Sequence, residues 1–103
     1  MAIVVRLESE FGKVIRQVID EGQATARALD QVFESGVEKQ FTVVRYIDPY
    51  GNATFNHLQM PVFLLEWEVL AAFCDPKERG FFAEVAALAR ECDTHRYLKF
   101  SGD

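Results

Sequence analysis

The segment from Pro61 to Cys74 limits the possible folds of this chain most, because it is too apolar for an ordinary surface helix. Pro61 suits the first turn of a helix, and Glu66 and Glu68 are the only two charged residues that interrupt the apolar side chains after it. The segment is too short to cross a bilayer, which takes about 20 apolar residues. We therefore expect a helix that is covered on several sides, either wholly inside one small domain or between its own sheet and another chain.

The start of the chain predicts a β-hairpin. Residues 2–8 are rich in β-branched side chains, and Gly12 suits the end of the turn that follows them. A returning strand over residues 13–20 would pair Ile3 with Ile19. Apolar residues in the returning segment also recur at helical spacing, so a helix remains an alternative there. We favour the hairpin, because its combination of strand and turn recurs at the same offsets later in the chain.

That second copy predicts another hairpin with a clearer turn. Residues 40–47 have the composition of a strand, and Asp48-Pro49-Tyr50-Gly51 has Asp, Pro and Gly at the positions they favour in a type I turn. The chain would return over residues 52–59. This register would place Arg45 and His57 on the same face of the sheet.

Three helices and a last strand complete the prediction. Residues 24–34 have helix-forming composition with Gly36 as a stop, and the apolar segment described above is the second helix. Asp75-Pro76-Lys77-Glu78 offers an N-cap, a Pro at the first helical position and a capping-box Glu, and it begins a helix that ends near Asp93. Residues 95–100 are aromatic and alternating, which indicates a strand.

This order of elements predicts a single α+β domain over residues 1–103. Strands grouped in hairpins favour an antiparallel sheet, here built from two hairpins plus a C-terminal strand, with about three helices packed on one face. If the first returning segment is a helix, the order approaches a ferredoxin-like β-α-β-β-α-β fold, which is the alternative.

The excess of acidic residues excludes some classes of binding partner. The 103 residues include 16 acidic and 11 basic side chains, for a net charge of −5. An acidic chain repels phosphate backbones and anionic lipids, so we expect neither nucleic acid nor membrane as a partner. The N-terminus lacks the pattern of a secretory signal peptide, and the expected location is the cytoplasm.

The sequence contains none of the common catalytic or metal-binding motifs, such as G-x-S-x-G, a Gly-rich phosphate loop, H-E-x-x-H or C-x-x-C. Cys92 and His95 have a C-x-x-H spacing, but zinc would need Cys74 and His57 to converge on them from remote positions. We expect no metal and no cofactor, and we expect both cysteines to be reduced thiols.

Glu66 is the residue whose type fits its position least. On a helical projection it lies in the middle of the apolar arc, where a carboxylate must find a partner or bind a proton. Arg45 or His57 on the adjacent sheet would neutralise it. Such a group is either a buried structural ion pair or a catalytic or ligand-binding site.

Charged side chains mark the surfaces of the last helix and the last strand. Arg79 and Arg90 flank the apolar arc of the helix on one side. His95, Arg96 and Lys99 give the strand a small basic patch, which is either a solvated face or a contact for an anion or acidic peptide.

Two functions are compatible with these features. The first is a non-enzymatic protein-interaction module, a homodimer or an inhibitor-, immunity- or adaptor-like protein, with Phe63, Leu64 and Trp67 as the residues that contact a protein partner. The second is a small-molecule-binding protein or enzyme that uses Glu66 with Arg45 and His57. The absence of motifs favours the interaction module.

Overall fold

The computed structural model describes residues 2–102, apart from the side chains of residues 37 and 38. Four strands form one antiparallel sheet in the order β2-β1-β4-β3. The strands are β1 (Ile3–Ser9), β2 (Val14–Asp20), β3 (Asn52–Asn56) and β4 (Arg96–Ser101). The helices are α1 (Ala24–Ser35), α2 (Met60–Ala71) and α3 (Arg79–Glu91), with short 3-10 turns at Val37–Gln40, Val44–Tyr46, His57–Gln59 and Pro76–Glu78. The predicted α+β class, with an antiparallel sheet and three helices, is confirmed.

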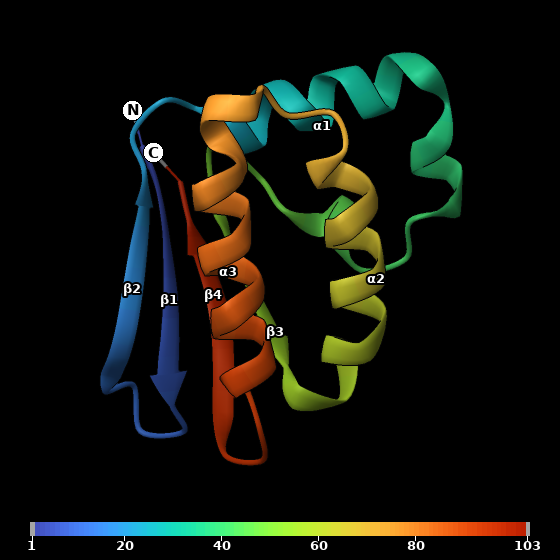
Figure 1. The fold of residues 1–103 in the computed structure, drawn as a ribbon. Coiled ribbons are helices and arrows are strands. Elements are labelled where there is room, and N and C mark those ends of the chain that lie inside the picture. Colours follow the sequence, from blue (N-terminus) through green and yellow to red (C-terminus); the bar gives the residue numbers. More distant parts are fainter. Residues whose placement is uncertain (1, 103) are drawn as a thin grey trace.

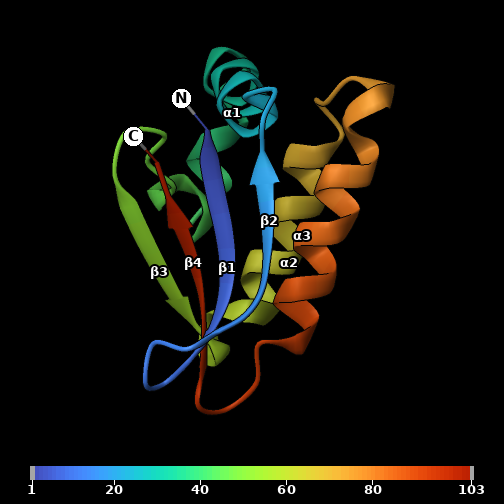
Figure 2. The same ribbon diagram turned by 90° about the vertical axis from the view of Figure 1, so that its left-hand side faces the viewer.

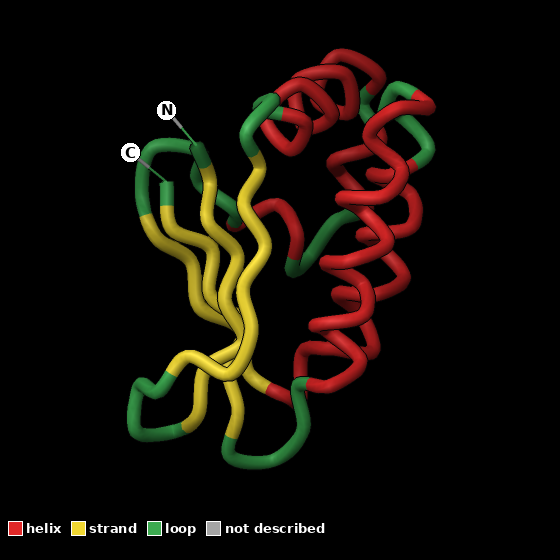
Figure 3. Tube along the Cα trace, turned by 60° about the vertical axis from the view of Figure 1, so that its left-hand side comes forward, coloured by secondary structure: helices red, strands yellow, loops and turns green. Residues whose placement is uncertain are grey.

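The helices and the sheet form two layers. α2 and α3 lie side by side and run in opposite directions along one face of the sheet, and α1 lies across one end (Figure 1). Figure 2 shows the helix pair on the side of β2, to the right of the strands, and Figure 3 shows the separation of the layers. In β1 the side chains of Ile3, Val5 and Leu7 point into the core, while those between them are half-buried on the open face. Period-two alternation therefore defines one core face and one solvent face.

The first hairpin is confirmed, with a register one residue from the predicted one. Gly12 ends the turn with φ of 83°, in the left-handed region that favours glycine. Ile3 lies opposite Asp20 instead of Ile19. A shift of one residue exchanges the two faces of a strand, so Ile19 is exposed and Asp20 is buried. Asp20 points inward because its two carboxylate oxygens accept hydrogen bonds from the backbone N–H groups of Ala24 and Thr25, the first two residues of α1.

The prediction of a strand over residues 40–47, as the first strand of the second hairpin, is wrong. Residues 40–47 form a loop with a 3-10 turn, and β3 pairs with β4 instead. Val43 and Val44 are both buried, which a strand with only one face toward the core does not allow. The predicted turn at residues 48–51 is present, with the N–H of Gly51 donating to the carbonyl of Asp48 over 3.2 Å.

The sequence signals predicted for the end of the first helix and for the start of the last helix are both confirmed. Gly36 ends α1 with φ of 82°, and its N–H donates to the carbonyls of Val32 and Phe33. Asp75 and Glu78 form the predicted capping box at the 3-10 turn that leads into α3.

An aromatic cluster occupies the centre of the core. Trp67 of α2 stacks on Phe63 with ring centroids 5.5 Å apart, and its indole N–H donates to the carbonyl of Phe82 on α3 over 3.0 Å. Phe55 and Phe100 contribute rings from the sheet. The hydrogen bond satisfies the indole N–H, which would otherwise be costly to bury.

Candidate functional site

The carboxylate of Glu66 binds the backbone of the loop that precedes β3. Its Oε1 accepts hydrogen bonds from the N–H groups of Val43 and Val44, each at 2.9 Å. Its Oε2 accepts from the N–H of Thr42 at 2.7 Å and from the Thr42 hydroxyl at 3.2 Å. Successive N–H groups that converge on one anion form a nest, and Glu66 of this same chain occupies it. The predicted burial of Glu66 is confirmed, but its partners are backbone N–H groups and the Thr42 hydroxyl, and not a cation.

Two opposing effects set the pKa of Glu66. Burial removes water from the carboxylate and raises the pKa, and this is the largest single effect. The hydrogen bonds from Thr42, Val44 and Val43 favour the ionised form, and together they hold the pKa of Glu66 below its ordinary value of 4.5. Glu66 is thus ionised at neutral pH, so it has no proton to donate as a general acid.

The structure does not bring Arg45 or His57 to Glu66. Arg45 is exposed in the 3-10 turn after the nest, with its guanidinium carbon 5.9 Å from the ring centroid of Tyr46. His57 is half-buried in the turn before α2, about two and a half helical turns from Glu66. Among the residues that the structure describes, no hydrogen bond or ion pair joins either side chain to Glu66.

The predicted partner-binding residues lie mostly inside the protein. Phe63 and Trp67 are 0% and 1% exposed, so neither presents its ring to a partner in this fold. Leu64 is half-buried on the side of α2 that faces α3. The helix is apolar on nearly every side, and a helical projection of such a sequence does not show which side faces the core.

A different face of α2 is apolar and exposed. It carries three aliphatic side chains, and a fourth, Leu58, is exposed in the 3-10 turn that leads into the helix. These four residues are called here the α2 stripe: Leu58, Val62, Leu65 and Val69, which are 75%, 40%, 68% and 43% exposed. The spacing of Val62, Leu65 and Val69 by three and four residues places them along one side of α2. The sequence shows this spacing, but because the helix is apolar on nearly every side, the spacing does not distinguish the exposed face from the face in the core.

A groove runs between α2 and α3, and none of the stripe residues lines it. Its volume is about 390 Å³, with Trp67 and Phe82 in its lining. Glu68 lines it from α2, and Arg79 and Arg90 line it from α3. The prediction that the two arginines share one side of their helix agrees with this arrangement. The groove is thus apolar at its centre and charged along its walls.

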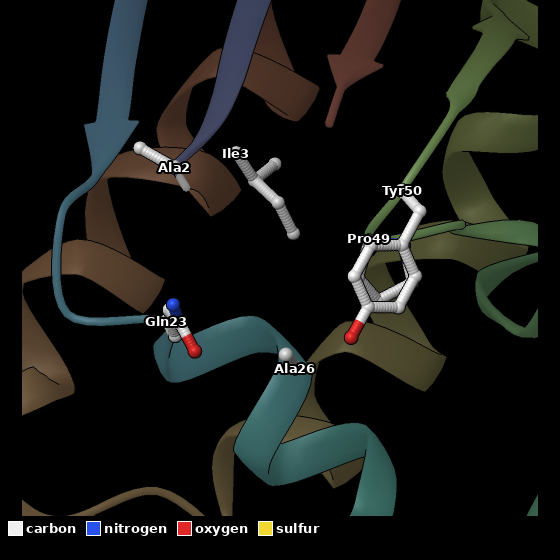
Figure 4. A pocket seen from close by; sticks show the side chains of 6 residues that line it. All are labelled: Ala2, Ile3, Gln23, Ala26, Pro49 and Tyr50. Carbon is white, nitrogen blue, oxygen red and sulfur yellow. The ribbon is translucent and has the colours of Figure 1, made fainter. Parts of the chain in front are cut away.

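A second pocket lies at the end of the sheet where the chain begins. Figure 4 shows that Ala2, Ile3 and Gln23 line it from one side and that the Tyr50 ring points from the opposite turn toward α1. Its volume is about 30 Å³, enough for about one or two water molecules. Metabolite sites usually enclose about 300 Å³ or more, so this pocket is too small to be one.

The basic residues near β4 are largely paired. Nδ1 of His95 lies 2.9 Å from the carboxylate of Glu10, and Arg96 lies 3.6 Å from that of Asp93. Because carboxylates of this chain already contact two of the three basic side chains, the patch is a weak candidate for binding an anion.

The two cysteines are free and differ in environment. Cys92 is buried, and burial, followed by the nearby charge of Asp93, raises the pKa of its thiol to about 11. Cys74 is half-buried and lines the α2–α3 groove. Among the side chains that the structure describes, no three His, Cys, Asp or Glu residues converge as metal ligands would.

Comparison with family models, with curated proteins and with solved structures gave no match for this chain. None of the helices in the described part of the chain combines the length and the apolarity needed to cross a membrane.

Proposed function

We propose that this protein is a non-enzymatic interaction module that binds a protein partner through the α2 stripe and the α2–α3 groove. The observation that carries the proposal is the α2 stripe itself. Folded monomers usually scatter their exposed aliphatic side chains singly, whereas this chain aligns three of them along one side of α2 and exposes a fourth, Leu58, in the turn before it.

The spacing of the stripe also fits a protein partner better than a small molecule. Apolar side chains that alternate at intervals of three and four residues form the seam along which two helices pack. The stripe begins with Leu58 and ends with Val69, so it spans roughly 16 Å. A seam of that length matches about three turns of a partner helix.

The alternative function, a carboxylate-dependent enzyme or ligand-binding protein, has less support. Hydrogen bonds from Thr42, Val43 and Val44 already use both oxygens of Glu66. Arg45 and His57 have no described contact with that carboxylate. No observation on the described residues favours this alternative over the interaction module.

Site-directed photocrosslinking of the full chain in a native extract tests the proposal. A photoreactive phenylalanine derivative replaces Leu65 in the stripe or, as the control, Thr54 on the open face of the sheet. We expect a protein adduct from position 65 only, and we expect Val69→Asp in the same chain to abolish it. Absence of an adduct at position 65, or equal adducts at both positions, would contradict the proposed function.

A further inference from the structure

We infer that the partner of the α2 stripe is a second copy of this chain, related by a two-fold axis that lays α2 of each protomer on α3 of the other. The inference rests on the proposed function and names the partner for it. It depends on features of α2 and α3 that are complementary to one another in charge and in size.

The charges of the groove are opposite in sign on its two walls. Glu68 is exposed on α2, and Arg79 and Arg90 are exposed on α3. Within the described residues none of the three forms an ion pair, although Arg16 pairs with Glu91 and Arg27 with Glu78. The groove therefore carries charges of both signs that are available to a partner.

Glu68 on α2 and the two arginines on α3 also lie at matching positions along the helix axes. Trp67 hydrogen-bonds to the carbonyl of Phe82, so Glu68 lies level with the part of α3 between the two arginines. Arg79 and Arg90 are three turns apart on the same side of α3, about 16 Å along its axis. When α2 of a second copy lies on α3 at the same height, its Glu68 falls between the positions of Arg79 and Arg90.

The side chains of the two helices are complementary in size. The exposed side of α2 carries the aliphatic side chains of the stripe. The exposed side of α3 carries two small residues, Gly80 and Ala83, among its charged side chains, and Ala87 is half-buried. The space around a Cβ at Gly80 is open to 4 Å. Laying α2 on α3 of a second copy places large side chains against small ones twice, once on each side of the axis.

The opposite arrangement, with α2 against α2, fits less well. It would bring the only exposed charges of these helix faces, the two copies of Glu68, to the same interface and leave the arginines without partners. A stable dimer also needs to bury about 800 Å² per protomer, roughly an eighth of the 5965 Å² surface of this chain. The four side chains of the stripe are too few to supply that area, so the interface must include the groove and α3.

Sedimentation equilibrium of the purified full chain tests the inference. We expect a mass of twice 11.7 kDa for the wild type at about 100 µM. Leu65→Asp should sediment as a monomer, and Thr54→Asp, which changes the open face of the sheet by the same chemistry, should remain dimeric. Both positions are exposed, and circular dichroism with urea unfolding checks that each variant is folded.

A charge exchange tests the orientation of the two copies. Glu68→Arg alone, and Arg79→Glu with Arg90→Glu, should each weaken the dimer by about tenfold or more in Kd. The chain that carries all three substitutions restores the opposite pairing and should recover most of the affinity. The proposed arrangement would be overturned if the Leu65→Asp variant still formed a dimer. It would also be overturned if the triple variant dimerised more weakly than Glu68→Arg alone.

Combining these results with the crosslinking experiment separates the two proposals. A monomeric wild type that still forms a stripe-dependent adduct with another protein overturns the self-association and leaves the proposed function in place. A monomeric wild type with no adduct at position 65 overturns both.

Discussion

The Oε1 atom of Glu66 lies 2.9 Å from the backbone nitrogen of Val44, which precedes it in the chain by 22 residues. This contact and its neighbours tie the loop before β3 to the middle of α2. The loop in turn supplies buried side chains to the core: Phe41, Val43, Val44 and Ile47. The residue that the sequence presented as a possible catalytic group therefore holds a segment of irregular backbone in place.

Removing this anion should destabilise the protein. In Glu66→Gln, an amide NH2 group replaces one acceptor oxygen and faces backbone N–H donors, and the charge that strengthens the remaining bonds is lost. We expect the free energy of unfolding to fall by about 2–4 kcal/mol, measured by urea unfolding at one fixed protein concentration.

Glu34→Gln is the matched control for this measurement, because Glu34 is exposed on a helix and its substitution should change stability by less than about 0.5 kcal/mol. If Glu66→Gln were as stable as this control, the hydrogen bonds to the loop would contribute nothing to the fold.

The stability due to Glu66 should depend on pH in a defined direction. Its folded-state pKa lies below the ordinary value of 4.5, so the folded state binds its proton less readily than the unfolded state does. The contribution is complete above that ordinary value, decreases as the pH falls toward the lowered folded-state pKa, and is lost below it. The difference in unfolding free energy between the wild type and Glu66→Gln should accordingly shrink in acid, and a difference that stays constant from neutral pH into acid would contradict this account.

Asp20 should stabilise the start of α1. Its two carboxylate oxygens accept hydrogen bonds of 2.8 Å from the N–H groups of Ala24 and Thr25, although Asp20 itself ends β2. We expect Asp20→Ala to cost about 1–2 kcal/mol, as the loss of an N-cap does. Asp30→Ala, at an exposed position within α1, should cost nothing, because alanine favours helix; thermal unfolding of both variants compares them.

The two thiols should react at very different rates with an aromatic disulfide reagent. Cys92 is buried, and burial raises its pKa to about 11, so little of it is thiolate at neutral pH. Cys74 is more exposed and should give the single fast phase, which Cys74→Ser removes. Because Cys74 lines the groove, this phase should slow as the protein concentration rises through the dimerisation range; two equal phases in the folded protein would show that Cys92 is accessible.

Features set by neighbouring residues were predictable from the sequence. The glycines at 12 and 36 have the left-handed backbone that their positions suggested, and the capping box of Asp75 and Glu78 forms as expected. Each depends on residues within about four positions of one another, so the local sequence contains the necessary information. The hairpin register was not predictable in this way, because the capping of α1 by Asp20 selects the face of β2 that points inward.

The α+β class, most of the elements and the burial of Glu66 follow from the order and type of the residues. Which face of α2 is exposed and which groups bind the Glu66 carboxylate depend on how the elements pack together. A helix that is apolar on nearly every side has no preferred face until its neighbours are in place, and the sheet and α3 cover the side of Phe63 and Trp67 while the α2 stripe faces outward. The partners of Glu66 are backbone N–H groups, which every residue except proline carries, so only the folded path of the chain selects those of Thr42, Val43 and Val44.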